Sequence, residues 1–439
     1  MTLLLRTAAV LAAALCLLAE TSAAADDTDK TPDTSLAKEV DRYLTEAASE
    51  GGDPNDLRAF WKTGIKLETA NGNFKIALIG RLMWDTAWRT SSDFPPMDSS
   101  TPPNNITMDN TFFRRARLGV EGTVYQNTAF KVQVDFASGT VALKDVFVGL
   151  NNLGGETKIS VVGGHFKEPF SLEELTSSKY IFFMERSAPT NAFAPSRNVG
   201  IYGRSTNLLK GRMYAAIGIF KTTNDQGAAT GDGDYSMTLR VAGLALHNKE
   251  QHTILHVGFG FTYRGDDTAR YRARPGTGSG DRLVDTGSLT VDSSSIFNFE
   301  IAFIWRGLSA SVEIFFTDTD VIGAQKSNFT GGYITVGYWV TGERQGWKNF
   351  AFARTKPNKN LYDGGGGYGA IWVGYRFDMI DLNDGSVTGG EQATHSLGVI
   401  WQWNPNTRML FNYVYVDVDS GPEGPGTMNV FEMRWQFDF

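Results

Sequence analysis

The chain has 439 residues, a formal net charge of −7, and a composition that combines 48 glycines with 29 phenylalanines, 15 tyrosines and 10 tryptophans. The acidic balance and the lack of a basic block argue against nucleic acid as a partner. Abundant aromatic residues and glycine on a moderately polar background are typical of a membrane β-barrel, in which half of each strand faces water. Composition alone also allows a large secreted β-sandwich.

The first 25 residues have the layout of a cleaved secretory signal. Arg6 precedes an apolar run over 7–19, and small residues at 22–25 stand before Asp26. The run is shorter than the ~20 residues that a membrane-spanning helix needs. The alternative is a buried first helix. We expect residues 1–25 to be removed on export, which would also remove the single cysteine, Cys16. No disulfide or zinc–thiolate site is then expected.

Residues 26–60 are predicted to form a periplasmic lead with a short amphipathic helix. The apolar residues of the helical pattern are Leu36, Val40, Leu44 and Ala47, and the pattern ends at glycines 51–52 and Pro54. A leader without regular structure fits the same residues equally well.

From residue 61 to the C-terminus the hydrophobic period is two. In 130–136, Phe130, Val132, Val134 and Phe136 share one face, whereas Lys131, Gln133 and Asp135 share the other. The segments 297–305 and 431–439 repeat this alternation. In a sandwich the apolar face would pack on a second sheet, whereas in a membrane barrel it would meet lipid and the polar face would line the lumen.

The spacing of these segments predicts an all-β, antiparallel transmembrane barrel of about sixteen strands in residues 61–439. The predicted strands are 73–88, 110–124, 129–137, 141–149, 156–166, 199–205, 208–220, 234–246, 252–264, 295–306, 308–317, 330–341, 368–379, 392–403, 406–418 and 428–439. Short joins alternate with long ones at 89–109, 167–198, 221–233, 265–294, 380–391 and 419–427, as in outer-membrane barrels.

Two joins break this rule, because 138–140 is short and 342–367 is long. A hairpin within 342–367, or pairing of 65–69 across Asn71-Gly72, would give eighteen strands instead. The sequence ends in Phe439, at the tip of a strand with aromatic residues two apart, which resembles the signal read by the barrel-assembly machinery of the outer membrane.

Four sequence segments carry a family resemblance. They are FRRARLGVEG at 113–122, FKEPFSLEELTSS at 166–178, FMER at 183–186 and NAFAP at 191–195. Together they resemble the phosphate-selective porin O and P family from about residue 61 to the C-terminus. The resemblance implies a sixteen-stranded, trimeric outer-membrane porin whose third external loop folds into the pore. The segment 167–198 fits that loop, because it is long, contains three prolines and lacks sustained alternation.

Alternation places Arg115 and Arg117 in the lumen and would turn Arg114 outward. Because an arginine that faces lipid at mid-bilayer costs roughly 2–4 kcal/mol, we expect Arg114 to lie at the rim or on a bulge instead. By resemblance, Ser177, Ser178 and Arg186 match loop positions that help to coordinate anions, and Arg115 and Asp145 match wall positions near the constriction. The predicted pore-lining or anion-contacting residues are Arg115, Arg117, Lys131, Asp145, Lys167, Ser177, Ser178, Arg186 and Arg197. The alternatives are that the serines only turn the chain, that Arg186 pairs with Glu185, and that Lys131 is an ordinary solvated lumen residue.

The predicted function is passive diffusion of small hydrophilic solutes with an anion preference, phosphate being one candidate. The loop weakens the inference to phosphate, because Glu168, Glu173, Glu174 and Glu185 balance Lys167, Lys179, Arg186 and Arg197. A non-selective or cation-preferring porin is therefore the alternative. The expected partners are small anionic or polar solutes, lipid and lipopolysaccharide of the outer membrane, and further copies in a homotrimer.

Two more distant alternatives are an outer-membrane barrel enzyme and a secreted β-sandwich binding module. His252 and His256 share one strand face but stand four residues apart, a spacing that does not by itself form a metal site. We expect no catalytic residues, no metal and no cofactor.

Overall fold

The structure is a computed structural model that describes residues 54–92, 107–137, 139–229, 234–278, 280–362, 364–422 and 424–439. The predicted signal and most of the predicted lead, including its helical pattern, lie outside the described residues. The chain divides into two units, Met1–Asp56 and Leu57–Phe439. The fold described below is that of the second unit.

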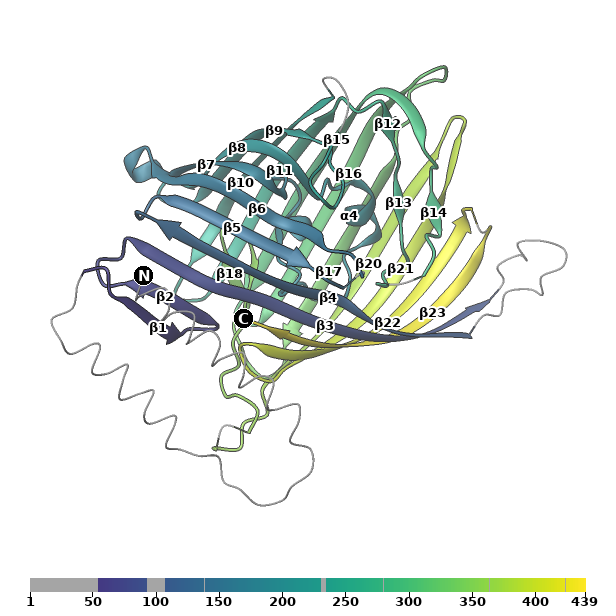
Figure 1. Cartoon of the computed structure of the whole chain (residues 1–439). Helices are drawn as coiled ribbons and strands as arrows, with labels where there is room; N and C mark the ends of the chain where they lie inside the picture. Colours follow the sequence, from purple (N-terminus) through teal and green to yellow (C-terminus); the bar gives the residue numbers. More distant parts are fainter. Residues whose placement is uncertain are drawn as a thin grey trace. The chain divides into compact units, whose positions relative to one another are not determined.

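The second unit is a closed antiparallel barrel of sixteen strands (Figure 1). The strands are β3 (Phe74–Ser92), β4 (Thr107–Val124), β5 (Thr128–Asp135), β6 (Ala142–Leu153), β7 (Ile159–Lys167), β8 (Arg197–Leu208), β9 (Met213–Lys221), β10 (Tyr235–Asn248), β11 (Thr253–Arg264), β15 (Leu289–Trp305), β16 (Leu308–Val321), β17 (Thr330–Trp339), β20 (Ala370–Asp384), β21 (Val387–Gln402), β22 (Thr407–Ser420) and β23 (Gly426–Asp438). Strand β23 pairs with β3 from Thr427↔Ser92 to Asp438↔Arg81, which closes the ring. The sixteen-strand prediction is confirmed.

The alternative of eighteen strands is wrong, because two further hairpins are present but neither of them is part of the ring. Strands β1 (Leu57–Trp61) and β2 (Ile65–Thr69) pair with each other, and β2 pairs with β3 only at Lys66–Glu68. They occupy the part of the β3 edge that β23 does not reach, outside the ring. Strands β18 (Gly346–Lys348) and β19 (Ala351–Ala353) form a separate hairpin in the connection between β17 and β20.

One predicted long loop, 380–391, is wrong. Strand β20 continues to Asp384 and β21 begins at Val387, so the connection is a tight turn. Ile380, Leu382 and Val387 are buried together with residues of the β11–β15 connection and of the β7–β8 connection. Because these connections cover the wall from inside, the strand carries apolar residues where alternation leads one to expect polar ones.

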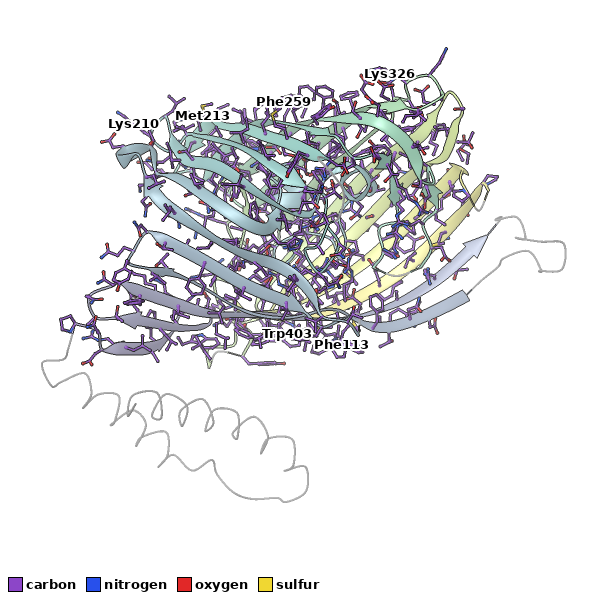
Figure 2. The ribbon with its side chains drawn as sticks, turned by 45° about the horizontal axis from the view of Figure 1, so that its top comes forward. Phe113, Lys210, Met213, Phe259, Lys326 and Trp403 are labelled. Atoms are coloured by element: carbon purple, nitrogen blue, oxygen red, sulfur yellow. The ribbon has the colours of Figure 1, made fainter. Side chains whose placement is uncertain are left out.

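The two faces of the barrel wall differ in polarity, in the sense opposite to that of a soluble sandwich. The outer face exposes large apolar side chains, for example Val148 at 58% and Ile201 at 56%. Phe113 and Phe259 lie on the same outer surface (Figure 2). Polar side chains such as Thr238 and Asn298 are fully buried on the inner face. An apolar exterior around a polar interior suits a lipid environment. No helix in the described ranges is long and apolar enough to cross a membrane.

The β7–β8 connection, residues 168–196, folds into the barrel and is called the inner loop here. It contains the short helices α3 (Leu172–Leu175) and α4 (Ala188–Phe193), and α4 is seen against the inner wall in Figure 1. The backbone amides of Leu172 and Glu173 donate to the Glu313 carboxylate on β16 at 2.9 and 2.7 Å. The amide of Ala188 donates to Asp378 on β20 at 3.1 Å. Wall carboxylates therefore hold the start of both helices.

Aromatic packing holds the same loop from a second side. The ring of Phe182 stacks on Trp372 of β20 at 4.9 Å. A Cβ on Gly337 or Gly374 would come within about 2.0 and 2.2 Å of the Trp372 ring, so only glycine leaves room for this indole on the wall. The glycines of β17 and β20 thus leave the space that the Trp372 ring fills, and the inner loop packs on that ring through Phe182.

Two other connections also enter the lumen. The β11–β15 connection carries β12 (Thr268–Ala269), β13 (Arg272–Ala273) and β14 (Val284–Asp285), and its Leu283 is buried against valines of β22 and β23. The β18–β19 hairpin buries Phe350 and Phe352 against β7–β11 and β15, and Arg240 donates to the carbonyl of Phe350 at 3.0 Å. The β6–β7 turn contains η1 (Gly155–Thr157).

Candidate functional site

A cavity of about 170 Å³ lies between the inner wall of β3–β8 and the inner loop, and it is called the cationic cavity here. Its lining residues are Arg81 (β3), Arg115 and Arg117 (β4), Lys131 (β5), Asp145 (β6), Lys167 (β7), Arg197 (β8), and Leu175, Ser177, Ser178 and Arg186 of the inner loop. All nine residues predicted from the sequence line this one cavity, together with Arg81 and Leu175. Seven of the lining side chains are cationic and one is a carboxylate.

A bulge in β4 allows Arg114, Arg115 and Arg117 all to turn toward the lumen. Met83 pairs with Arg115 and Trp84 with Phe113, so Arg114 is the extra residue of the bulge. Its guanidinium turns inward and donates from Nε and Nη2 to Glu185, both at 2.8 Å. Of the two positions expected for Arg114, the rim and a bulge, the structure shows the bulge, which spares Arg114 the cost of facing lipid.

Carboxylates hold most of the cations in place. Arg117 pairs with Asp135 at 2.7 Å. Asp145 accepts from Arg197 at 2.8 Å and from Lys131 at 3.1 Å. These pairs fix the side chains on the wall and neutralise part of their charge.

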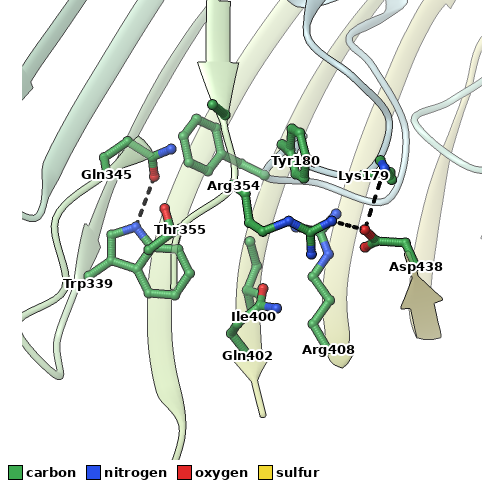
Figure 3. A pocket seen from close by; sticks show the side chains of 12 residues that line it. Lys179, Tyr180, Trp339, Gln345, Arg354, Thr355, Ile400, Gln402, Arg408 and Asp438 are labelled. Carbon is green, nitrogen blue, oxygen red and sulfur yellow. Dashed lines mark hydrogen bonds and ion pairs between the residues drawn. The ribbon is translucent and has the colours of Figure 1, made fainter. Parts of the chain in front are cut away.

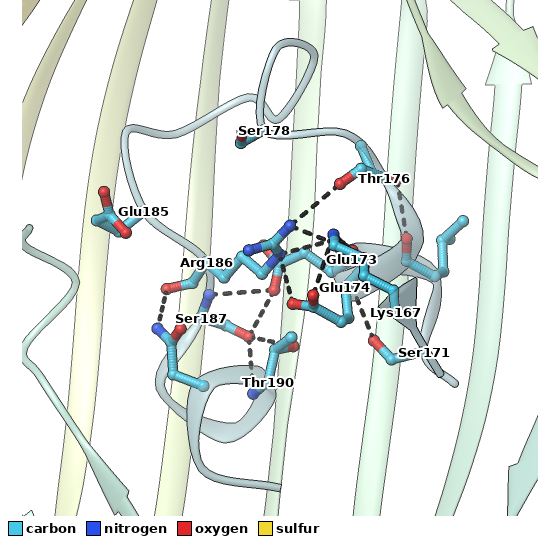
Figure 4. A network of polar contacts seen from close by, with 12 residues as sticks. Lys167, Ser171, Glu173, Glu174, Thr176, Ser178, Glu185, Arg186, Ser187 and Thr190 are labelled. Atoms are coloured by element: carbon cyan, nitrogen blue, oxygen red, sulfur yellow. Dashed lines mark hydrogen bonds and ion pairs between the residues drawn. The ribbon is translucent and has the colours of Figure 1, made fainter. Parts of the chain in front are cut away.

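Arg186 organises the inner loop rather than presenting free donors (Figure 4). It donates to the carbonyls of Glu173, Glu174 and Thr176 at 3.0–3.2 Å, and pairs with the Glu174 carboxylate at 3.1 Å. The alternative partner considered for it, Glu185, contacts Arg114 and Arg434 instead. The alternative of an Arg186–Glu185 pair is therefore wrong, because the loop turns these two neighbours to opposite sides.

Two arginines in the cavity have donors without a partner. Arg81 donates from Nη1 to the Ser178 hydroxyl at 2.5 Å, and Arg115 has its Nη1 at 3.5 Å from the sulfur of Met83 and 3.7 Å from Glu185. Their Nε atoms are buried without any hydrogen-bond partner, and the residues are only 8% and 4% exposed. A buried guanidinium with an unused donor is costly unless an acceptor arrives.

Neighbouring cations lower the pKa of two carboxylates of the inner loop. Burial would raise the pKa of Glu174, but Arg186 and Lys167 together hold that pKa below its ordinary value. Burial would likewise raise the pKa of Glu185, but Arg114, Arg115 and Arg434 lower it strongly. Both loop carboxylates are therefore charged at neutral pH.

Lys179, at the tip of the inner loop, lies beside Tyr180, Arg354, Arg408 and Asp438 around a void of about 10 Å³ (Figure 3). Burial and the positive charges of Arg81 and Arg354 lower the pKa of Lys179 to about 8, against the opposing effect of Asp438. Lys179 and Arg354 both pair with Asp438, so the loop tip, the β17–β20 connection and the last strand meet at this carboxylate.

Two groups of arginines were missed from the sequence. Arg81 is the direct cross-strand neighbour of Arg117, so pairing the predicted strands would have found it. Arg272, Arg274 and Arg282 lie in the β11–β15 connection, where burial and the charges of Arg274 and Arg272 lower the pKa of Arg282. The alternation of arginine at 270, 272 and 274 was visible in the sequence, but it fell in a segment predicted to be a loop.

A second cavity, of about 890 Å³, borders the cationic cavity and is called the vestibule here. The two share Lys131, Asp145, Lys167 and Leu175. The vestibule extends to β1 and β2, to Asn151 near the end of β6 and to the β18–β19 hairpin. The two cavities adjoin on the β3–β8 side of the lumen, while the connections described above fill the other side.

His252 and His256, which the sequence singled out, line neither cavity. His252 donates from Nε2 to the carbonyl oxygen of Gln345 at 2.8 Å, and His256 contacts Glu300 at 3.0 Å beneath Trp347. Within the part of the chain that the structure describes, no group of three or more His, Cys, Asp or Glu is placed to hold a metal ion.

A closed sixteen-stranded barrel with an apolar exterior and a lumen narrowed by inward-folded connections is the architecture of an outer-membrane porin. The model of the family "Phosphate-selective porin O and P" matches residues 88–439, and the chain belongs to this family. It is an outer-membrane protein, and the secreted β-sandwich alternative is excluded by the closed ring. The barrel-enzyme alternative has no support in a family of channels.

Individual relatives agree with this assignment. The chain is 32% identical to an uncharacterized protein of Caulobacter vibrioides over 342 residues, covering 74% of this chain and 68% of the relative. It is 26% identical to porin O of Pseudomonas aeruginosa over 429 residues, covering 88% and 93%. The solved structure of an anion-selective porin from Comamonas acidovorans superimposes with a TM-score of 0.53 at 12% identity, covering 83% of this chain and all of that one, and so shares the fold.

Proposed function

We propose that this porin passes small oxyanions in preference to cations, and that the cationic cavity is the selective part of the passage. The observation that carries the proposal is the convergence of seven cationic side chains on one cavity of about 170 Å³, with unpartnered Nε donors on Arg81 and Arg115. Phosphate is one such oxyanion, and the family name supports it as a candidate.

The physical reason is that charges in a narrow, low-dielectric passage act more strongly than the net charge of the chain. Guanidinium groups donate pairs of hydrogen bonds to oxyanions, and the Ser177 and Ser178 hydroxyls lie in the same cavity. None of the four loop glutamates lines the cavity, although Glu174 pairs with Lys167 and Arg186 behind its surface and so neutralises part of the charge. Glu168, for example, pairs with Arg264 at 2.7 Å on the other side of the loop.

The test is the reversal potential of single channels in a planar bilayer under a salt gradient. We expect an anion-directed potential for the wild type, and a shift toward zero in Arg81→Gln and Arg115→Gln. Lys326→Gln is the matched control, because this lysine is exposed in the β16–β17 connection with 59% of its side chain accessible. A cation-directed potential in the wild type would refute the proposal and favour the cation-preferring alternative.

We also propose that three copies associate in the membrane and contact lipid and lipopolysaccharide elsewhere. Strands β5 and β7 have eight and nine residues, whereas β15 has 17, so the barrel wall is lowest around β5–β7. The outer face there exposes Val132 and Val148. A low apolar wall favours contact between copies at this side. Native mass spectrometry from detergent, with Val148→Lys as the disrupting variant, tests the trimer.

A further inference from the structure

The vestibule has an aromatic wall next to the cationic cavity. Phe147 of β6, Phe166 of β7 and Tyr202 of β8 all line the vestibule. The rings of Phe147 and Phe166 are 6.0 Å apart edge-on, and those of Phe166 and Tyr202 are 4.8 Å apart. The guanidinium of Arg204 lies 5.6 Å from the centre of the Tyr202 ring. This side of the passage is therefore both aromatic and positively charged.

These rings sit where alternation along the strands calls for polar residues. Phe147 is two residues from Asp145 on the same inner face, and it pairs with Gly164 across the strands. A Cβ on Gly164 would come within 2.7 Å of the Phe147 backbone, so the close pairing of the two strands at Phe147 requires glycine at position 164. Phe166 and Tyr202 belong to the same buried apolar cluster as Phe350 and Phe352 of the β18–β19 hairpin, whereas Phe147 is only partly buried. A partly exposed ring in a water-filled passage gains free energy when an apolar solute covers it.

The cationic cavity has room for only a few new hydrogen bonds. Asp145, Asp135 and Glu174 already occupy Lys131, Arg197, Arg117, Lys167 and Arg186. Among the buried donor atoms of the cavity, Nε of Arg81 and of Arg115 have no partner in the structure. Leu175 lines both cavities and continues the apolar strip of the vestibule into the cationic cavity.

We propose that the passage favours organic anions that carry one oxyanion head on an aromatic ring over inorganic anions. The head, a phosphate or a carboxylate, binds in the cationic cavity, and the ring lies against Phe147, Phe166 and Tyr202. Lys131, which lines both cavities, is the direct cross-strand neighbour of Phe147, and Phe147 lies about 7 Å along β6 from Asp145. A phenyl phosphate or a benzoate whose head lies at the shared edge of the two cavities can therefore place its ring on Phe147. This inference rests on the proposed anion preference and adds the class of solute.

The experiment compares two probes with the same head group. Phenyl phosphate and methyl phosphate are added to wild-type channels carrying chloride current in a planar bilayer, and the half-blocking concentration of each is measured. We expect phenyl phosphate to block at a concentration about tenfold lower, because its ring covers apolar surface on the wall. Benzoate against acetate is the parallel pair, and the larger ratio of the two pairs identifies the preferred head.

Phe147→Ala should reduce the ratio of the two phosphates to below about threefold, while the block by methyl phosphate stays the same. Phe299→Ala is the matched control, because this phenylalanine lies on the outer face and is 51% exposed. If Phe147→Ala does not assemble, Phe147→Leu serves in its place, and the wild-type ratios decide the matter without any variant.

Failure of this inference can be told apart from failure of the proposed function. Anion-directed channels that both phosphates, and both carboxylates, block equally would overturn the aromatic preference and leave the anion preference standing. Cation-directed channels that neither phosphate blocks would overturn both. A ratio that Phe147→Ala and Phe299→Ala leave equally unchanged would overturn the assignment of the ring to this wall.

Discussion

Arg434 of β23 is the side chain whose removal should most clearly loosen the inner loop. It is fully buried and donates to both oxygens of Asp85 at 2.7 Å, to the carbonyl of Met184 at 2.5 Å and to Glu185 at 2.9 Å. Arg434→Met keeps the length of the side chain but removes every donor. Glu185 then retains Arg114, whereas the buried carboxylate of Asp85 loses both of its bonds.

Breaking a buried pair on one side costs about 3–5 kcal/mol, because the remaining charge has no partner. We therefore expect Arg434→Met to lower the free energy of unfolding by about 3–5 kcal/mol. Removing both partners leaves no orphaned charge, so the double variant Asp85→Leu/Arg434→Met should lose less than about 2 kcal/mol. Lys210→Met, in the exposed β8–β9 turn, should change the stability by less than about 0.5 kcal/mol.

The assay is urea unfolding of protein refolded into lipid vesicles, followed by tryptophan fluorescence, for the wild type, both single variants, the double variant and the control. Strong non-additivity of the two single variants is the expected signature of a buried pair. The reasoning is refuted if Arg434→Met costs less than about 1 kcal/mol, or if the two single losses simply add in the double variant.

Four further predictions concern other parts of the chain. Lys179 loses its charge around its lowered pKa of about 8, so the anion preference should fall between pH 7 and 9 in the wild type, and Lys179→Gln should remove that pH-dependent part. Because the unfolded chain holds this proton up to its ordinary pKa of 10.5, the ionisation of Lys179 should raise stability as pH increases from about 8 to 10.5, measured by urea unfolding against the same variant. Gly80→Ala would place a Cβ 2.5 Å from the ring of Phe439, and should reduce the yield of heat-modifiable barrel on gels at a cost of about 1–3 kcal/mol. Mass spectrometry of the exported protein should find Asp26 as its first residue; an intact N-terminus would contradict the predicted signal.

The sequence alone determined the class of fold and much of the candidate site. A period of two from residue 61 onward and the alternation of short and long joins predicted a sixteen-stranded barrel, because each strand must show one face to lipid and one to water. The same alternation placed Arg115, Arg117 and Lys131 on the lumen side, and all of them line the cationic cavity. Their contact with a passing anion stays a prediction.

Only the tertiary structure decided how the charges divide and which strands extend furthest. The segment 167–198 has as many acidic as basic side chains, but the fold directs Glu168 and Glu185 to wall arginines and leaves Lys167 and Arg197 in the cavity. The strand ends around 384–387 likewise depend on the connections that cover them from inside. Alternation reports which face a side chain takes, but not which distant segment will fold over that face. That choice depends on contacts between residues far apart in the chain, such as Arg434 with Glu185, and local patterns carry no record of them.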